Sequence, residues 1–373
     1  MMSLLLVLCT SLPAQWIESR QTAYPDRENE TIAVPYYHVP VPDDVGFGWG
    51  FYYDYGRLPA QYRSADYQLK CMRHMAAMGL NTFTLYGWLG DKDISDVALQ
   101  VRLGVEAGLI GDFPLMILPC GEPEDVMGAL EPLLPEGLPE LVGYGPDEPG
   151  SSTDAGAQVA SGAEKWQEQG VRCATAISAA SAASVGNPLD IWIVHAPNLG
   201  DVPVGSGKEL WMYDCELRGT NYALHRYYCG IYAFVAHKRM NVKSAWLWSY
   251  VDSAESGVFQ LEDGSWVFDA RRVCEHALPG PDGPIGTVGL DGIRDGIADF
   301  KVLYEVDRCG LYPEWIEWLC DTVPLNLWEG TDHPGGPEES GYFWDAPDIA
   351  KPKIDIQKTM EKAAEFLRQP APD

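Results

Sequence analysis

The fold is decided by the stretch Glu140-Leu-Val-Gly-Tyr-Gly-Pro-Asp-Glu-Pro149, together with a helical pattern over 153–170 and the run Arg172-Cys-Ala-Thr-Ala-Ile177. The apolar run at the start of the first stretch predicts a buried strand, and Arg172 to Ile177 predicts a second one. Two strands joined by a helix form a βαβ unit, in which the strands are parallel. The same alternation recurs along the chain, which indicates an α/β fold.

We expect eight strands alternating with helices, which is the element order of a (β/α)8 TIM barrel. A doubly wound sheet is the rival fold, but the chain after the first strand reads Asp54-Tyr-Gly-Arg-Leu-Pro59 and lacks the glycine-rich turn of that fold. The expected strands are 46–54, 82–88, 114–119, 140–144, 172–177, 190–195, 209–213 and 244–250. The expected helices are 64–78, 94–107, 124–133, 153–170, 222–239 and 290–306.

The expected domain organisation is one large catalytic barrel over 46–327 with short flanking segments. Residues 1–15 are a candidate signal peptide or its remnant, with a small-residue cleavage site at Ala14 but no basic start. The protein is therefore expected to be secreted or periplasmic if that segment is a signal, and cytoplasmic otherwise. Residues 16–45 read as an extended lead-in, and 328–373 as a loop-rich patch with a last helix over 354–367 on the outside of the barrel.

Composition excludes several classes of protein. Lys plus Arg is 26 and Asp plus Glu is 54, for a net charge of −28, so nucleic acid is a poor partner. No apolar stretch reaches the roughly 18 residues of a membrane span. The nine cysteines form no Cys-x-x-Cys pair, so neither a zinc site nor a thioredoxin-type motif is indicated, and no cofactor is expected. The oligomeric state has no signal in the sequence.

Adjacent acidic residues, Asp147 and Glu148, are the strongest candidate for chemistry. They lie at the expected end of a barrel strand, where the active sites of such barrels are built. Neighbouring side chains of a strand point to opposite faces, so both reach one pocket only where the chain leaves the sheet. Pro146 and Pro149 favour such a departure. An acidic turn that caps the next helix is the structural alternative, but the position favours a catalytic pair.

Aromatic side chains near other strand ends are candidates for binding a sugar, because they can stack on the apolar face of its ring. Each one taken singly is more often a core residue. His195 lacks a second histidine or cysteine at ligand spacing, so no metal site is predicted, and no Gly-x-Ser-x-Gly motif supports a serine nucleophile. The predicted substrate-binding residues are Tyr86, Tyr144, Trp192, Tyr213, Trp246 and Trp248.

Four segments together resemble glycoside hydrolase family 123 and a larger barrel family beside it. They are 144–149, the run Glu209-Leu-Trp-Met-Tyr213, the passage 226–248, and Asp291-Gly-Ile-Arg-Asp-Gly-Ile-Ala-Asp-Phe300. The last is fairly specific, and the resemblance covers most of 144–308. It implies an exo-acting β-N-acetylgalactosaminidase that works by substrate-assisted catalysis, with the Asp-Glu pair at Asp147 and Glu148.

The resemblance also implies that a tyrosine, here Tyr213, donates to the acetamido oxygen of the substrate. This chain departs from the pattern in two ways. The usual arginine five residues before Arg294 is Gly289, which bears on the identity of the substrate. The β-sandwich that typically precedes the barrel is missing, which suggests a reduced catalytic module or a divergent member.

Two rival functions stay open on the sequence. In the first, Glu148 is the acid/base and Glu216 the covalent nucleophile of a retaining glycosidase that acts on a non-acetylated sugar. In the second, the barrel binds carbohydrate without turnover, which the acidic surface and the aromatic residues also permit. In every case the expected partner is a glycan or glycoconjugate.

Overall fold

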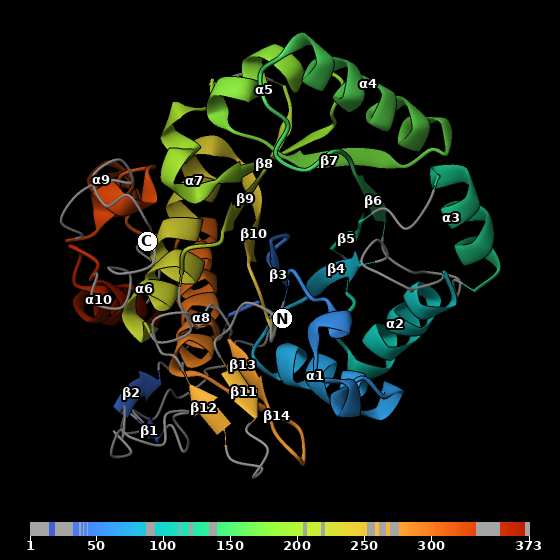
Figure 1. Ribbon diagram of the computed structural model, residues 1–373. Coiled ribbons are helices and arrows are strands. Elements are labelled where there is room, and N and C mark those ends of the chain that lie inside the picture. The colour runs from blue at the N-terminus through green and yellow to red at the C-terminus, as the bar shows by residue number, and fades with distance from the viewer. Residues whose placement is uncertain are drawn as a thin grey trace, which may run out of the picture.

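The computed structural model of the chain contains a closed barrel of eight parallel strands (Figure 1). It describes residues 15–18, 33–36, 39, 41–42, 44–86, 94–111, 113–118, 122–133, 140–203, 207–217, 221–251, 258–260, 266–268, 276–332 and 351–369. Around the barrel the strands follow the order β10-β3-β4-β5-β6-β7-β8-β9. The expected (β/α)8 TIM barrel is thus confirmed. The strands are β3 (Gly48–Phe51), β4 (Thr82–Tyr86), β5 (Leu115–Leu118), β6 (Leu141–Tyr144), β7 (Arg172–Ala176), β8 (Ile191–His195), β9 (Glu209–Asp214) and β10 (Val242–Leu247).

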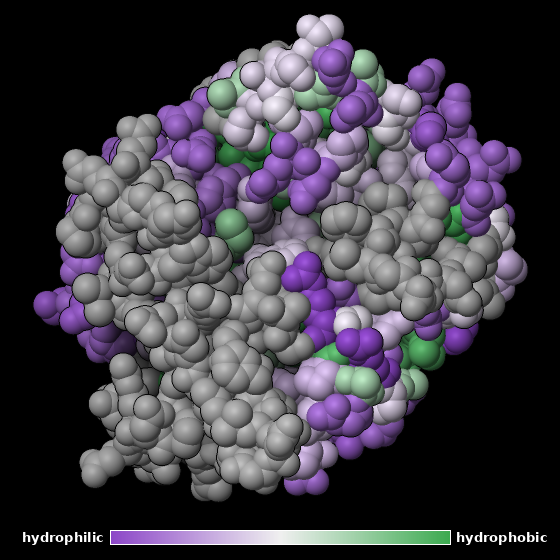
Figure 2. Space-filling model, in the orientation of Figure 1, coloured by the Kyte–Doolittle hydropathy of each residue, from purple (hydrophilic) through white to green (hydrophobic). Residues whose placement is uncertain are grey.

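Helices cover the outside of the barrel, and several begin at a residue whose side chain accepts a backbone N–H of the first turn. Ser64, Ser152 and Thr287 cap α1, α4 and α8 in this way. Figure 2 shows mostly hydrophilic residues over α3 and α4 on the outer rim. The helices are α1 (Ala65–Ala77), α2 (Ile94–Ala107), α3 (Pro123–Leu130), α4 (Thr153–Glu168), α5 (Ala179–Val185), α6 (Tyr222–Tyr227), α7 (Ala233–Met240), α8 (Val288–Arg308), α9 (Pro313–Thr322) and α10 (Ile356–Arg368).

Several elements differ from the sequence prediction or were not predicted. The helix expected over 222–239 is interrupted by a π-helical turn, η5 (Tyr228–Tyr232), between α6 and α7. Helices α5 and α9 were not expected, nor were three two-stranded antiparallel sheets. These sheets pair β1 (Gln15–Glu18) with β2 (Ala33–Tyr36), β11 (Val258–Gln260) with β12 (Trp266–Phe268), and β13 (Ala277–Pro279) with β14 (Pro284–Gly286). The candidate signal segment up to residue 14 lies outside the described residues.

The core has two layers, because side chains along each strand alternate between the barrel interior and the surrounding helices. In the interior, the indole rings of Trp211 and Trp246 stack with centroids 5.6 Å apart. The outer layer includes Phe83, Val194 and Met212 from the strands and the apolar faces of the helices. The interior cluster comprises Tyr52, Met116, Leu118, Val142, Tyr144, Ala174, Ala176, Ile191, Ile193, Trp211 and Trp246.

The segment 291–300, which carries much of the family resemblance, packs α8 against α6. A Cβ atom on Gly292 would lie 2.3 Å from the carbonyl oxygen of Tyr222, and one on Gly296 would lie 2.6 Å from that of Arg226. Only glycine permits so close an approach of the two helix backbones. Arg226 forms a buried, bidentate ion pair with Asp299, with distances of 2.6 and 3.0 Å. In this structure the segment therefore has a packing role.

Candidate active site

The chain turns sharply where β6 ends, at the predicted acidic pair. The N–H of Gly145 still donates to Ala174 of β7, at 2.8 Å, and a Cβ at Gly145 would lie 2.5 Å from Oγ1 of Thr175. Three residues later Glu148 adopts a left-handed conformation with φ of 42°, which is unusual for a residue with a side chain. Asp147 and Glu148 are both exposed to solvent at this carboxyl end of the barrel.

Tyr144 fixes the position of Asp147. Its phenolic O–H donates to Oδ1 of Asp147 at 2.5 Å, and the same oxygen accepts the backbone N–H of Ala176 at 3.2 Å. Desolvation raises the pKa of Asp147, and the charge of Glu148 adds to this rise, while the hydrogen bond from Tyr144 lowers it. Burial also raises the pKa of Tyr144 well above its usual value, so this phenol remains a donor.

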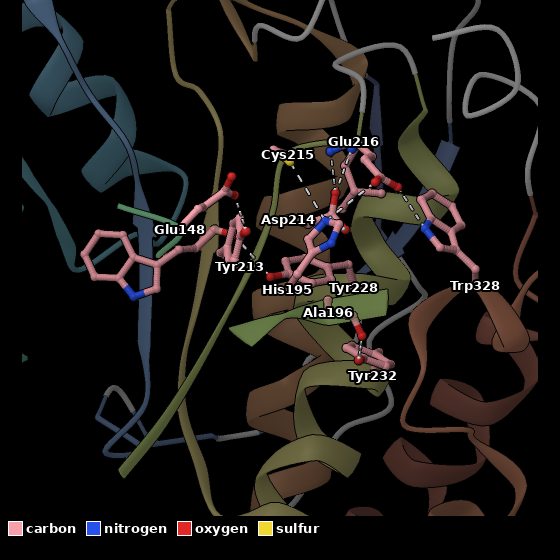
Figure 3. Close-up of polar contacts among 12 residues, drawn as sticks. Glu148, His195, Ala196, Tyr213, Asp214, Cys215, Glu216, Tyr228, Tyr232 and Trp328 are labelled. Atoms are coloured by element: carbon pink, nitrogen blue, oxygen red, sulfur yellow. Dashed lines mark hydrogen bonds and ion pairs between the residues drawn. The ribbon is translucent and has the colours of Figure 1, made fainter. Parts of the chain in front are cut away.

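Tyr213 holds the second carboxylate from the opposite side of the barrel mouth. Its O–H donates to Oε1 of Glu148 at 2.7 Å, a contact seen in Figure 3. Burial and the hydrogen bond to Glu148 raise the pKa of Tyr213 above its usual range. The ring of His195, on β8, lies 5.1 Å from that of Tyr213 and supports it. Each member of the acidic pair is thus held by a different tyrosine of the barrel interior.

Two aromatic residues extend this site beyond the predicted set. Tyr52 follows β3, is 5% exposed, and has a hydroxyl without a hydrogen-bond partner among the described residues. Its burial, and next the negative charge of Asp147, raise its pKa above the usual range. The ring of Trp248 lies 5.6 Å from that of Tyr52, and the guanidinium of Arg57 lies 4.9 Å over the indole of Trp248.

Other predicted binding residues lie elsewhere. Trp192 faces the outer helices and donates through Nε1 to the carbonyl of Gly186, so its assignment to the binding site was wrong. Trp246 was also wrongly assigned, because its ring is fully buried in the barrel interior and its Nε1 donates to Ser244. Tyr144 is 3% exposed and contacts Asp147 from below. The side chain of Tyr86 lies outside the described residues.

A second group of acids lies at the end of β9, where Asp214 and Glu216 flank Cys215. Figure 3 shows Glu216 directed toward Trp328, on the far side of Tyr213 and His195 from Glu148. The Nε1 of Trp328 donates to Oε2 of Glu216 at 2.9 Å, while Oε1 lies 3.7 Å from Nε2 of His195. Burial raises the pKa of Glu216 to about 8, with a further contribution from the nearby charge of Asp214.

Asp214 and His195 complete this second group. Asp214 is fully buried; its Oδ1 accepts two backbone N–H groups, and its Oδ2 lies 3.8 Å from Nε2 of His195. Burial raises the pKa of Asp214 to about 7 and lowers that of His195 to about 4. A neutral imidazole is therefore favoured here at neutral pH, and burial shifts both carboxyl groups toward their protonated forms. No set of three or more histidine, cysteine or acidic residues suited to a metal ion occurs within the described part of the chain.

Some of these residues could have been found from the sequence. Tyr52 lies in the expected first strand, two residues after Gly50. Because side chains of a strand alternate between its two faces, both residues face the barrel interior. Trp328, by contrast, reaches Glu216 across 112 positions of the chain and leaves no local signal.

Comparison with known proteins places the chain in no family. No family model matches it, and no curated protein does. Among solved structures it is similar to ScGas2 in complex with compound 7, with a TM-score of 0.39 and 9% identity over 69% of this chain and 66% of the other. ScGas2 in complex with compound 8 gives a TM-score of 0.37 and 10% identity, over 80% and 74% of the two chains. Likenesses this distant carry no argument about function.

Among the described residues, no helix is long and apolar enough to cross a membrane.

Proposed function

We propose that the protein is a glycoside hydrolase, an exo-acting β-N-acetylgalactosaminidase or a related N-acetylhexosaminidase. The observation that carries the proposal is the pair Asp147 and Glu148 at the barrel mouth, each held by its own tyrosine. Two carboxyl groups with separate donors can serve two roles in one reaction. The family resemblance of the sequence suggests the substrate, a sugar with a 2-acetamido group.

In this proposal the substrate supplies the nucleophile. The acetamido carbonyl oxygen attacks the anomeric carbon, and the bond to the leaving oxygen breaks as Glu148 protonates that oxygen. Asp147 accepts the acetamido N–H and stabilises the positive charge of the resulting oxazolinium ion. Glu148 then takes a proton from water, and the water oxygen attacks the anomeric carbon. The bond between that carbon and the acetamido oxygen breaks, which restores the acetamido group and releases the sugar with its configuration retained. The hydroxyl of Tyr213 positions Glu148 before the sugar arrives.

The contact between Tyr213 and Glu148 modifies the expected role of this tyrosine. For its hydroxyl to donate to the acetamido oxygen, as the resemblance implies, it has to leave Glu148 when substrate binds. Among the described side chains, Trp248 is the candidate for stacking on the sugar, because it is partly exposed and packs beside Tyr52 at the mouth, while Tyr86 stays a prediction.

The rival with Glu216 as a covalent nucleophile is less well supported. A nucleophilic carboxylate has to be ionised, whereas burial raises the pKa of Glu216 to about 8. One of its oxygens is also occupied by Trp328, on the side away from Glu148. The non-catalytic binder remains the alternative from a different class.

Kinetics on aryl β-glycosides separate these functions. We expect turnover of N-acetylgalactosaminide or N-acetylglucosaminide and little turnover of galactoside or glucoside. Asp147→Asn should reduce kcat by about a hundredfold or more, because it removes the charge that stabilises the oxazolinium, while Glu216→Gln should have a mild effect. A thiazoline mimic of the oxazoline should inhibit. The reverse ordering of the two variants would establish the covalent mechanism, and no turnover of any glycoside would leave the binder.

A further inference from the structure

A groove of about 620 Å³ lies between α9 and α10, on the outer layer of the protein. Figure 1 shows these two helices side by side at the margin of the molecule, away from the end of β6 that carries the acidic pair. The groove is therefore separate from the candidate active site. Its lining residues are Trp315, Trp318, Thr322, Lys353, Ile354, Asp355, Lys358, Thr359 and Lys362.

Trp318 gives the groove an exposed aromatic surface. It is 50% exposed, the highest value among the large hydrophobic residues described as exposed, although apolar side chains of this size normally bury most of their surface. Trp315 lies one turn earlier on the same face of α9 and is 8% exposed. The ring of Trp315 packs edge-on against Phe366, with centroids 5.1 Å apart, which ties it to α10. The helix is thus anchored by one indole and presents the other to solvent.

The charge of the groove is opposite to that of the chain. Acidic residues outnumber Lys and Arg by 54 to 26 in the sequence, yet the groove has three lysines and one aspartate. Lys358 pairs with Asp355 at 3.1 Å, but its side chain is 81% exposed. Lys353 donates to the carbonyl oxygen of Glu329, and the ammonium of Lys362 lies 5.9 Å from the ring centroid of Trp315. An ammonium has three donors, so each of these lysines retains donors for a ligand.

We propose that the α9–α10 groove binds a short acidic oligosaccharide, with one or two carboxylates. The exposed face of Trp318 would stack on the C–H face of a sugar ring, and the ammonium groups of Lys358 and Lys362 would bind the carboxylates. These two lysines are four residues apart and lie on one face of α10. The inference goes beyond the proposed hydrolysis and does not depend on it.

The observations favour a glycan over a nucleic acid, which also combines stacking with positive charge. Single-stranded nucleic acid requires several stacking rings and a continuous basic track. The groove offers one half-exposed ring and a net charge of about two, in a chain whose total charge is −28. A ligand with one or two negative charges can pair with the lysines alone, whereas a long polyanion would also be repelled by the acidic surface around them.

Titration calorimetry of the intact protein with digalacturonate tests this proposal, with the matching neutral disaccharide and a short oligothymidylate as comparison ligands. We expect digalacturonate to bind, and the neutral disaccharide to bind at least several-fold more weakly. Trp318→Ala should weaken binding about tenfold or more, and Lys358→Gln and Lys362→Gln a few-fold each, with the lysine effects shrinking as salt is added. Lys70→Gln, on α1, removes the same charge elsewhere and should leave binding unchanged.

Three results would overturn the inference. The first is that digalacturonate does not bind, or that a Trp318→Ala variant shown to be folded by circular dichroism binds it as tightly as the unmodified protein. Another is equal binding of the neutral disaccharide or tighter binding of the oligothymidylate. The third is loss of binding in Glu148→Gln, which would place the ligand at the barrel mouth. Since the measurement uses binding alone, a failure here is distinct from a failure to hydrolyse aryl glycosides.

Discussion

The ion pair between Arg226 and Asp299 provides the sharpest test of how α6 and α8 are held together. The side chains are 7% and 3% exposed, and two charge-assisted hydrogen bonds of 2.6 and 3.0 Å join them. Replacing Asp299 by leucine leaves the guanidinium buried without its carboxylate. Replacing both residues, as Arg226→Met with Asp299→Leu, removes both charges and fills the space with apolar atoms.

The expected magnitudes follow from this geometry. Breaking a buried pair from one side costs about 3–5 kcal/mol, because the desolvated charge that remains has lost its hydrogen-bonded counterion. Replacing both partners by apolar residues of similar size is often neutral or stabilising by about 1–4 kcal/mol. We therefore expect each single variant to be strongly destabilised and the double variant to recover most of the loss. The coupling energy between the two sites should exceed about 2 kcal/mol.

Urea unfolding followed by tryptophan fluorescence measures these free energies in the four proteins of the cycle. Lys238 and Asp307 form a matched control pair, joined at 2.9 Å with side chains 36% and 28% exposed. The same cycle there should give a coupling of less than about 1 kcal/mol, because solvent screens the charges. If the double variant at Arg226 and Asp299 loses as much stability as the sum of its singles, the pair does not connect the helices as described.

Two further predictions concern stability. Gly296→Ala places a methyl group against the carbonyl of Arg226 and should lower the stability by about 1–3 kcal/mol. Gly128→Ala in α3, where a Cβ has nothing within 4 Å, should raise the stability by up to about 1 kcal/mol. Thermal unfolding measures both, and equal effects would contradict the close contact between the helices. Burial raises the pKa of Asp214 to about 7 and of Glu216 to about 8, so the folded state holds protons that the unfolded chain releases above about pH 4. Their contribution to stability is present at low pH and declines as pH rises toward 8, by up to about 1.4 kcal/mol per pH unit for each proton. Glu216→Gln should flatten that decline, and an unchanged pH profile of urea unfolding would refute the assignment.

The barrel could be predicted from the sequence because its signal is local. Each strand is a short apolar run, and each of the eight expected runs overlaps a strand of the closed barrel. The position of Asp147 and Glu148 followed from the same rule, since they come directly after one of these runs. Helices were also expected over 64–78, from its apolar spacing, and over 153–170, and in the structure Ser64 and Ser152 cap the two helices. None of these inferences required knowledge of contacts between distant residues.

The aromatic residues were harder to place, because their roles depend on the register of the closed barrel. Trp192 is next to Ile193, which faces the interior, so Trp192 has to face the helices. Trp246 does face the interior, but it lies at the level of Trp211 and is buried there, one layer below Trp248. The sequence indicates which residues alternate; it does not show at what height each ring lies in the barrel.

Within the proposed mechanism, the two tyrosines also give a reason why the acidic pair at the end of β6 suits a cationic intermediate better than the acids of β9. Arginine or lysine partners would hold the carboxylates equally well but would neutralise them. Phenols position Asp147 and Glu148 without adding charge, and their raised pKa values keep them protonated as pH rises. Among the described residues, neither carboxylate forms an ion pair. In the proposed mechanism the negative charge of Asp147 is thus available to the positive charge of the oxazolinium ion, whereas burial favours the neutral form of Glu216.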